Sequence, residues 1–512
     1  MRASKWWMLV VTCLSVVVVG LDLTILNIAL PAISAGLHAG TADLQWVIDA
    51  YSLAFAAVML PAGVIGDRVG RRRLLLAGLV VFLAASVWCA VSVSAGELIA
   101  ARALMGLGAA IVFTLSLAVV SAAFGDAERP KAIGILTAAV AAGLPLGPVL
   151  GGVLLQHFSW HSVFWINVPA VCVTLAAGAV LLPESHNPAA PPLDVLGVLL
   201  SAGAVTCLVW GAIDGPEHGW AAPSAWALLT GSAVLLAAFL AREHRAAHPL
   251  IDRKLFADRR FTWGTAATVA VSVALFGLMF VVPQYLQSVA GDDPVSAGLR
   301  LLPMMGGLLV AGGAASPVAR AAGTRLTVAA GLALLTAGLA VLSQVHPATG
   351  YTVVATGLAL CGLGTGASVA AAMDQVMAAA GGDEAGAAAA LNSTLRQVGG
   401  AIAVAVLGSA LSASYTRALA PALDPLPAAA AAAARASITQ AAQLASRLPG
   451  GPALRAAAGS AYLHGMSIVM LICAAVTVLA ALTSLRYLPG RATPGLSRQP
   501  APAASPPART RR

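Results

Sequence analysis

Four charged residues stand inside long apolar stretches of this sequence and are the first candidates for chemistry. They are Asp22, Asp49, Arg102 and Arg396. A charge inside a bilayer costs about 2.5–3.5 kcal/mol on insertion scales, so each of these side chains needs a partner or a function. An aspartate that pairs with an arginine in one conformation and binds a proton in another would couple proton movement to a conformational change. The alternative is a static ion pair that holds two helices together.

The depth of each residue in its apolar stretch predicts which of them can meet. Asp22, Asp49 and Arg102 all fall in the outer half of their stretches, so these three residues could meet. Asp49 is interpreted as a second protonation site or a contact for cationic substrates, or else as a solvated residue near a helix end. Arg396 lies about 15 Å into its stretch, where it faces a cavity or pairs with an acid. Asp374 is one possible partner for Arg396. Alternatively, Asp374 lies at the membrane interface and does not pair with Arg396.

The composition places these stretches in a membrane. Of the 512 residues, 59% are hydrophobic and only 10% are charged, which excludes an ordinary soluble protein. Fourteen stretches are long enough to cross a hydrocarbon core of about 30 Å. They must be helices, because an open strand would leave backbone groups unpaired in lipid. The predicted spans are 8–30, 46–66, 74–93, 98–121, 131–155, 162–182, 194–214, 224–241, 262–288, 297–318, 326–345, 350–377, 386–412 and 462–485.

The net charge of +9 follows the sidedness expected of a membrane protein. With a cytoplasmic N-terminus, alternate loops receive the lysines and arginines, as the positive-inside rule requires, and both termini are then cytoplasmic. This distribution argues against nucleic-acid binding. The six cysteines show no metal-ligand spacing, and the sequence contains no Walker A pattern and no serine-based catalytic motif. We therefore expect no enzyme, no metal and no cofactor, with the proton gradient as the energy source.

A glycine-rich basic sequence joins the second and third predicted spans. It runs from Gly63 to Arg73, and its glycines permit a tight turn and close helix approach. Asp67 and Arg71 are four residues apart, so they can form a charge-paired latch with a neighbouring helix end. A simple positive-inside anchor is the alternative. The residues assigned to the conformational latch are Gly63, Asp67, Arg68, Gly70 and Arg71.

The fifth predicted span contains a second glycine pattern. Gly143, Gly147 and Gly151 are spaced by four and share one helix face, which allows close packing of a partner helix. Prolines in the same span bend the helix and free backbone carbonyls. The whole pattern comprises Gly134, Gly143, Gly147, Pro148, Gly151 and Gly152.

Together these motifs resemble those of the major facilitator superfamily, in particular its fourteen-span drug/proton antiporters of the EmrB/QacA type. The Gly63–Arg73 turn is similar to the hallmark loop of the superfamily, and Leu21–Pro31 resembles the first-span signature of that antiporter family. In similar proteins the fifth-span pattern is the antiporter motif, typical of exporters, and the positions of Asp22 and Arg102 serve in proton coupling. Further landmarks lie at Trp46–Leu53, Arg102–Gly108, Trp160–Pro169, Pro283–Gln287 and Arg396–Gly400.

The resemblance implies an all-α membrane protein with the major facilitator fold, in which two six-helix bundles and two extra transmembrane helices make fourteen spans. We expect the N-terminal bundle at 1–187, the extra helices at 188–250, and the C-terminal bundle at 251–487 with an external excursion at 413–460. Residues 488–512 are rich in Pro, Arg and Ser and are predicted to form a disordered cytoplasmic tail. The candidates for lining a cavity are Asn27, Tyr51, Gln284, Gln287, Arg396 and Gln397.

The sequence thus predicts a multi-pass antiporter of the plasma membrane. It would use inward proton flow to expel lipophilic, cationic or amphipathic drugs. Its partners would be the drug, protons and the lipid bilayer, and it would act as a monomer. Proton-coupled uptake of a small metabolite is one alternative, and a transport-inactive sensor or scaffold is another. The charges kept within the membrane argue against the scaffold, since such a protein has little need of them.

Overall fold

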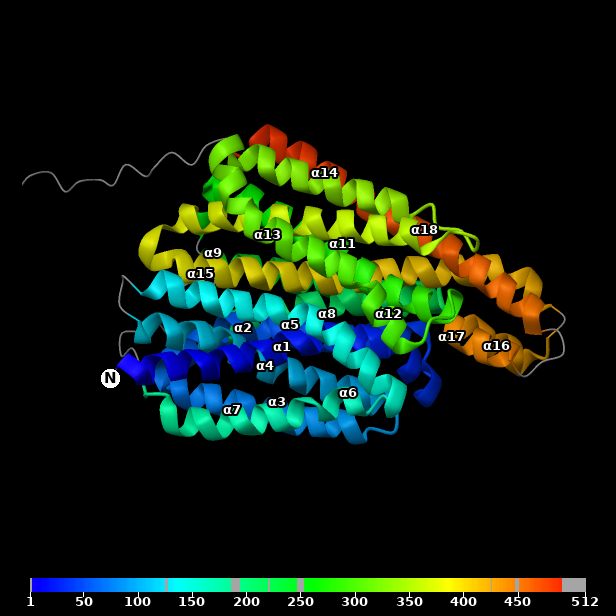
Figure 1. Ribbon diagram of the computed structural model, residues 1–512, viewed down its shortest axis with the longest axis horizontal. Coiled ribbons are helices and arrows are strands. Elements are labelled where there is room, and N and C mark those ends of the chain that lie inside the picture. Colours follow the sequence, from blue (N-terminus) through cyan, green and yellow to red (C-terminus); the bar gives the residue numbers. More distant parts are fainter. Residues whose placement is uncertain are drawn as a thin grey trace, which may run out of the picture.

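A computed structural model describes residues 2–124, 128–185, 194–219, 222–245, 253–424, 426–446 and 451–489. Every regular element in these ranges is a helix, as predicted. The helices run roughly parallel to the long axis of the molecule (Figure 1). Helices satisfy their own backbone groups, which is what a chain surrounded by hydrocarbon requires.

The first group of helices forms the N-terminal bundle. In it α1 packs on α5, α2 packs on α4, and α3 packs on α4 and α7. The elements are α1 (Arg2–Leu37), α2 (Thr41–Val69), α3 (Arg71–Val91), α4 (Ala95–Ala123), α5 (Arg129–His157), α6 (Ser162–Trp165) and α7 (Asn167–Leu181).

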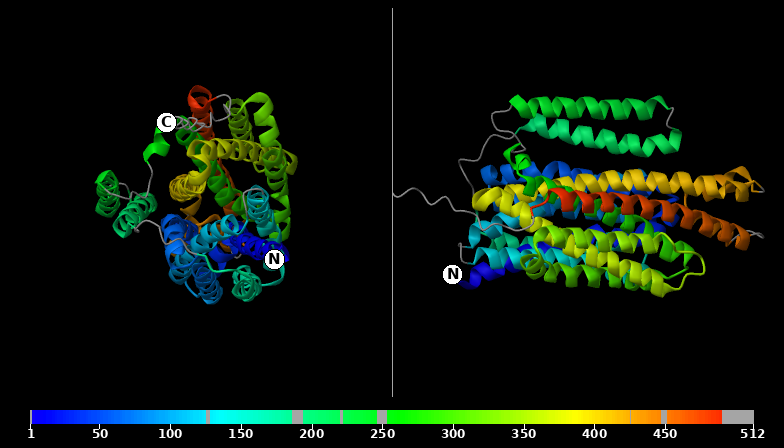
Figure 2. Two further views of the ribbon diagram at one scale, coloured as in Figure 1. Left: turned by 90° about the vertical axis from the view of Figure 1, so that its left-hand side faces the viewer. Right: turned by 90° about the horizontal axis from the view of Figure 1, so that it is seen from above.

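Two further helices, α8 (Val195–His218) and α9 (Pro223–Arg245), form a hairpin at the side of the molecule (Figure 2). The inner helix α8 packs on α2 and on α15, whereas α9 packs mainly on α8. The hairpin is therefore attached to the rest of the protein through one of its two helices.

The C-terminal group is built around α15, a helix of 73 residues that reverses direction partway along its length (Figure 1). Its two arms hold separate candidate spans, at Tyr351–Ala379 and Leu391–Leu423. The elements are α10 (Arg253–Ala257), α11 (Arg259–Gln284), the π-helix η1 (Tyr285–Val289), α12 (Pro294–Arg300), α13 (Leu302–Ala322), α14 (Thr324–Leu342), α15 (Tyr351–Leu423), α16 (Ala428–Ala436), α17 (Ile438–Ala445) and α18 (Gly451–Tyr487).

Among the described residues, 12 helical segments are long and apolar enough to cross a membrane. The predicted spans 46–66 and 131–155 fall on α2 and α5 and are not among these 12. Both helices contain residues whose side chains lie outside the described part of the chain.

The predicted excursion at 413–460 covers the last turns of α15, the short helices α16 and α17, and the first turns of α18. Helix α15 continues to Leu423, and α18 begins at Gly451, so the two short helices α16 and α17 lie within 424–450. Alanine has the highest helix propensity, and the extension of α15 also buries Tyr415 and Leu419. Of the predicted tail, residues 490–512 lie outside the described part.

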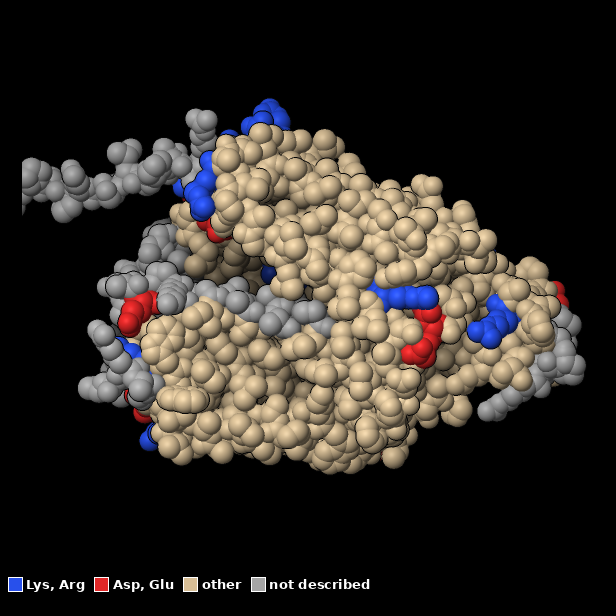
Figure 3. All heavy atoms as spheres, viewed as in Figure 1, with Lys and Arg blue, Asp and Glu red and all other residues tan. Residues whose placement is uncertain are grey.

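The two ends of the bundle differ in charge. We call one the basic end, because the α2–α3 and α13–α14 junctions bring arginines there, and the opposite one the cap end, because α16 and α17 lie there. The lateral face visible between the two ends carries almost no charged side chains (Figure 3). Such an uncharged band is what a membrane-spanning surface requires.

Candidate functional site

A buried ion pair joins α1 to α4 within the N-terminal bundle. Arg102 Nη1 donates to Asp22 Oδ2 at 2.7 Å, and the two side chains are 2% and 0% exposed. The structure thus brings together the two charges that were expected to meet. Removing one partner of such a pair leaves an uncompensated buried charge, which costs about 3–5 kcal/mol.

Helix α2 holds the arginine from a second side. Arg102 Nε donates to the carbonyl of Val47 at 3.2 Å, and the guanidinium carbon lies 4.1 Å from the centre of the Tyr51 ring. Gly106, one turn further along α4, lies so close to the Tyr51 backbone that a Cβ would collide with the Tyr51 carbonyl oxygen. Close helix packing therefore places a carbonyl and an aromatic face around the same cation.

Two polar residues complete the surroundings of Asp22, and the sequence did not single them out. Asn167 Nδ2 lies 3.5 Å from Asp22 Oδ1 and donates to Ser86 Oγ at 3.2 Å. Ser86 in turn donates to the Phe164 carbonyl at 2.8 Å. Both side chains are uncharged, so the cost of burying a charge gives no signal for them. Asn167 does lie inside the stretch Trp160–Pro169, which was noted only as a family landmark.

Asp49 is also buried, with 0% of its surface exposed. Neither of its carboxylate oxygens has a hydrogen-bond partner among the described residues. The interpretation as a solvated residue near a helix end is therefore wrong. A carboxylate held without a partner costs several kcal/mol, so this position requires a proton or a cationic ligand.

The glycine face of α5 packs directly on α1, the helix that carries Asp22. A Cβ on Gly143 would lie 2.7 Å from the Val17 carbonyl oxygen, and one on Gly147 would lie 2.8 Å from the Ile25 amide nitrogen. Gly151 faces Ile25 in the same way. The ion pair and the glycine motif are therefore connected through opposite faces of one helix.

The far end of the same motif reaches the C-terminal bundle. A Cβ on Gly152 would lie 2.6 Å from the Pro294 carbonyl oxygen. In the same way, a Cβ on Gly298 would collide with the Pro148 carbonyl oxygen. Helices α5 and α12 therefore meet backbone to backbone at the cap end. Gly134, which belongs to the predicted motif, lies outside the residues whose surroundings are described.

The turn between α2 and α3 is held by a carboxylate that sequence reasoning missed. Gly70 has φ 119°, a conformation that favours glycine, and a Cβ there would lie 2.6 Å from Glu184 Oε1. The same Glu184 oxygen accepts from the Arg72 amide at 3.2 Å.

The other residues of the predicted latch lie around this turn. Gly63 packs near Thr114, and Arg68 and Arg71 both have interaction partners. The side chain of Asp67, which was expected to act in the latch, lies outside the description.

In the C-terminal bundle, Arg396 has no acidic partner among the described residues. Its Nε donates to Ser272 Oγ on α11 at 3.0 Å. Asp374 is exposed and accepts instead from Ser316 Oγ at 3.2 Å. The two residues therefore do not pair in this conformation, and the interfacial position of Asp374 stays a prediction.

The remaining cavity candidates divide by exposure. Asn27 and Gln284 are buried and donate to carbonyls of their own helices, Leu23 and Phe280. Tyr51 is buried against Arg102, as described above. Arg396, Gln397 and Gln287 are partly exposed. Figure 3 shows a hollow near the basic end with a basic side chain in its depth.

The two bundles are joined near the cap end by hydrogen bonds that the sequence did not predict. Gln45 Nε2 on α2 donates to the Ala405 carbonyl on α15 at 2.8 Å, and Gln287 Nε2 donates to the Ile28 carbonyl on α1 at 2.9 Å. Ser34 Oγ lies 3.1 Å from Ser437 Oγ beside α17. The molecule is therefore closed between the bundles at this end.

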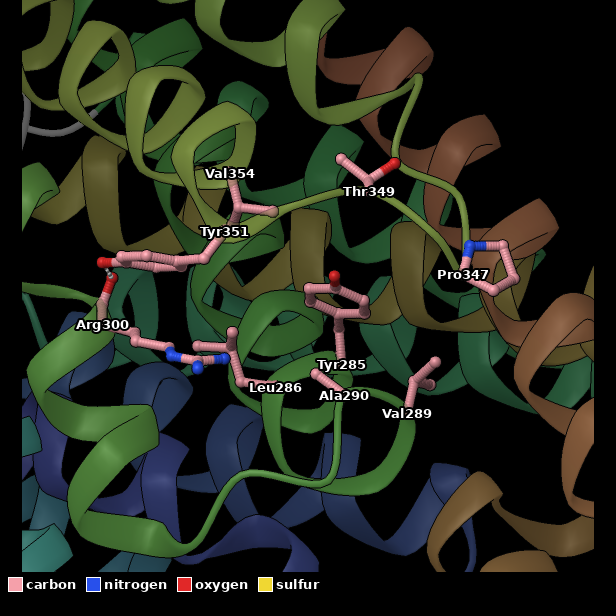
Figure 4. Close-up of a pocket in the computed structure, with 9 residues that line it drawn as sticks. All are labelled: Tyr285, Leu286, Val289, Ala290, Arg300, Pro347, Thr349, Tyr351 and Val354. Carbon is pink, nitrogen blue, oxygen red and sulfur yellow. Dashed lines mark hydrogen bonds between the residues drawn. The ribbon is translucent and has the colours of Figure 1, made fainter.

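A separate cavity of about 260 Å³ lies in the C-terminal bundle at the cap end (Figure 4). Within it Arg300 Nη1 contacts Asp292 Oδ2 at 2.5 Å, and the Tyr351 hydroxyl donates to the Arg300 carbonyl at 3.1 Å. Burial raises the pKa of Asp292 above its usual value, although Arg300 acts against the shift. The lining residues are Tyr285, Leu286, Val289, Ala290, Arg300, Pro347, Thr349, Tyr351 and Val354.

Comparisons with known proteins agree on one family. Residues 12–404 match the family described as Major Facilitator Superfamily. The tetracenomycin C resistance and export protein of Streptomyces glaucescens is 33% identical over 501 residues, which are 95% of this chain and 92% of that protein. The multidrug resistance protein Stp of Mycobacterium tuberculosis is 35% identical over 426 residues, covering 83% and 79%. The methyl viologen resistance protein SmvA of Salmonella typhimurium is 33% identical over 476 residues, covering 91% and 94%.

Solved structures share the fold at low sequence identity. A bacterial homologue of the human lysosomal transporter Spinster has a TM-score of 0.65 at 15% identity, covering 97% of this chain and 100% of that one. The nucleoside transporter NupG has a TM-score of 0.60 at 11% identity, covering 95% and 100%.

Proposed function

This chain belongs to the Major Facilitator Superfamily, and we propose that it is a proton-coupled antiporter that exports toxic small molecules from the cell. Members of this superfamily are transporters and not enzymes. Relatives across most of the chain are named for resistance to tetracenomycin C, to methyl viologen or to multiple drugs. These compounds support lipophilic, cationic or amphipathic substrates here. The observation that carries the proposal is the buried Asp22–Arg102 pair on a helix packed against the α5 glycine face.

The proposal includes fourteen spans and a cytoplasmic basic end. Besides the 12 candidate spans, α2 and α5 are helices of 29 residues each, longer than the roughly 20 residues that a bilayer needs. Their packing against α4 and α1 supports counting them as spans. The positive-inside rule then places both termini in the cytoplasm and the cap end outside the plasma membrane.

In this orientation the molecule receives its substrate from the cytoplasm. The cross-bundle hydrogen bonds of Gln45 and Gln287 close the outer side, and the hollow in Figure 3 lies toward the inner side. Export then requires these contacts to break while the basic end closes. Rocking of the two bundles around a central site is the motion that transporters built from repeats use.

Proton coupling follows from the choice that Asp22 faces between Arg102 and a proton. In the present conformation Arg102 supplies the positive charge that offsets the Asp22 carboxylate, so the carboxylate needs no proton for this purpose. If rocking separates α1 from α4, the isolated carboxylate requires a proton, which enters from outside and leaves inside when the pair re-forms. One charge moving through 100 mV supplies about 2.3 kcal/mol, which sustains about a fifty-fold gradient of a neutral substrate.

Asp49 extends the proposal to cationic compounds. Its carboxylate is buried without a partner among the described residues, so either a second proton or the positive charge of a substrate can occupy it. A cation bound here would replace the missing counter-charge. No cofactor other than the proton gradient is required, and we propose that the protein acts as a monomer.

Purified protein in proteoliposomes tests the proposal directly. With an acidic lumen and the cap end inward, methyl viologen or tetracenomycin C added outside should trigger proton release from the lumen and accumulate inside. Asp22→Asn should abolish drug-dependent proton release while the protein still inserts into the membrane. The control is Asp374→Asn, which removes an exposed acid at the basic end and should leave transport unchanged. Normal proton release by the Asp22 variant, or drug movement with the proton flow, would refute the assignment.

A further inference from the structure

An amphipathic groove runs between the two helices of the peripheral hairpin at the basic end. Its volume is about 460 Å³, and it lies between the first turns of α8 and the last turns of α9. The wall is formed by Leu196, Leu200, Ala238 and Ala241, and the end by Arg242 and Arg245. An apolar wall that ends in two guanidinium groups suits a ligand with an apolar body and an anionic head.

One of the two arginines is held in place by a buried acid. Arg242 Nε lies 2.7 Å and 3.0 Å from the two carboxylate oxygens of Asp194. Asp194 also caps α8, because its Oδ1 accepts from the Gly197 amide at 2.9 Å. Burial raises the pKa of Asp194, but the Gly197 amide and Arg242 outweigh it and hold the pKa below its usual value. The carboxylate therefore stays charged at neutral pH and orients the guanidinium.

The second arginine supplies the uncompensated charge. Arg245 is exposed in the last turn of α9 and has no acidic partner among the described residues. Asp194 neutralises one arginine, so the described residues that line the groove keep a net positive charge. Arg242 bonds Asp194 through Nε, and its terminal nitrogens make no hydrogen bond to the described residues.

The groove faces the lipid. Helix α9 packs mainly on α8, and its apolar side chains Trp226, Val234 and Leu240 are all more than half exposed. The hairpin stands at the side of the molecule (Figure 2), where α8 packs over the seam between α2 and α15 and α9 lies outside α8. The groove lies between α8 and the outer helix α9, so a molecule in it is reached from the bilayer.

We propose that this groove binds an anionic phospholipid of the leaflet at the basic end. The lipid phosphate would sit on Arg245 and on the terminal nitrogens of Arg242, and an acyl chain would lie along Leu196, Leu200 and Ala238. Arginine binds phosphate with paired hydrogen bonds, and basic pockets between transmembrane helices on the cytoplasmic side bind anionic headgroups. The apolar wall favours a lipid over free phosphate, because free phosphate has no apolar part that could pack on the wall. This site is independent of the exported compound.

Native mass spectrometry of the full, delipidated protein tests the proposal. Phosphatidylglycerol and phosphatidylcholine with the same acyl chains are titrated separately, and we expect tight binding of one phosphatidylglycerol only. Arg245→Leu should weaken that binding about tenfold, which corresponds to about 1.4 kcal/mol, and should leave phosphatidylcholine unaffected. The matched control is Arg325→Leu, since Arg325 is an exposed arginine at the same end on α14.

A second variant separates lipid binding from simple charge attraction. Ala238→Phe fills the groove without changing any charge and should also remove the bound phosphatidylglycerol. Thermal unfolding of each variant in detergent verifies that it is folded. The proposal is overturned if the two lipids bind equally, if Arg325→Leu weakens binding as much as Arg245→Leu, or if Ala238→Phe retains the lipid. Displacement of phosphatidylglycerol by millimolar inorganic phosphate would also overturn the proposal, because it would show that the site recognises the phosphate group alone and not the acyl chain.

Discussion

The two bundles share a turn but differ in the charges that they bury. Gly70 between α2 and α3 has φ 119°, and Gly323 between α13 and α14 has φ 89°, each ending one helix and starting the next. The N-terminal bundle buries the Asp22–Arg102 pair, whereas among the described residues the half-buried Arg396 of the C-terminal bundle bonds only to the Ser272 hydroxyl. The backbone repeat is thus kept in both halves, whereas in the described part of the chain a fully buried ion pair is found in one.

This difference indicates that the halves respond differently to the same substitution. A buried pair depends on both partners, because each charge left alone has no solvent to replace the other. A half-buried arginine retains part of its hydration. We therefore expect charge changes to affect stability and coupling in the N-terminal bundle far more than in the C-terminal one.

The largest expected effect comes from removing one buried arginine in each half. Arg102→Met leaves Asp22 buried without its partner and should lower the free energy of unfolding by about 3–5 kcal/mol. Arg396→Met loses a single hydroxyl hydrogen bond and should cost about 1 kcal/mol. Thermal and denaturant unfolding in detergent compare the two. The double variant Asp22→Asn with Arg102→Met should recover most of the loss, and equal costs for the two arginine variants would contradict the comparison.

Glycine packing provides the next contrast. Gly147→Ala forces a methyl group against the backbone of α1 and should cost about 1–3 kcal/mol, with reduced transport. Gly306→Ala on α13 places its methyl group in open space and should change stability by no more than about 0.5 kcal/mol. Unfolding and drug-dependent proton release are measured for both. A harmless Gly147 variant would mean that α1 and α5 are more loosely packed than described.

The shared turn allows a direct test of equivalence. Both Gly70→Ala and Gly323→Ala place a side chain at positive φ, which costs about 1–2 kcal/mol. The Gly70 variant should be the worse of the two, because its methyl group also lies 2.6 Å from Glu184 Oε1. Glu184→Ala should reduce that difference. Equal losses of stability would show that the Glu184 side chain moves aside without a cost in free energy of unfolding.

The smallest effect on stability is expected at Asp49. Asp49→Asn replaces a buried acid that has no partner among the described residues, so the free energy of unfolding should stay the same or rise slightly. Export of methyl viologen should nevertheless fall more than export of a neutral compound. Transport of the two substrates by the same proteoliposomes measures this difference. Equal loss for both would assign Asp49 to proton binding and not to cation recognition.

Much of this arrangement was predictable, because the membrane imposes a strict rule on sequence. Long apolar stretches must be helices, and the all-helical fold is confirmed. The cost of a membrane charge singled out Asp22 and Arg102, which the structure places in contact. The same reasoning suggested Asp374 as a partner for Arg396, and the two do not pair in this conformation. Depth along a span says nothing about which face of each helix meets its neighbour.

Neutral partners were the residues that sequence reasoning missed. Asn167, Ser86 and Gln45 carry no charge, so nothing in their composition sets them apart from other polar residues. Glu184 lies in a polar stretch where an acid is unremarkable, yet it braces the Gly70 turn 114 residues earlier in the chain. Their partners became visible only when distant helices were packed together.

The amino-acid sequence alone determined that this chain lies in a membrane, that it spans it with helices, and which glycine faces allow close packing. Those properties depend on local composition and on the 3.6-residue period of one helix. Tertiary structure decided which charges pair, which acid is left alone, and which end is closed. These outcomes depend on how each helix is rotated about its axis against its neighbours, and that rotation is set by packing across the whole molecule.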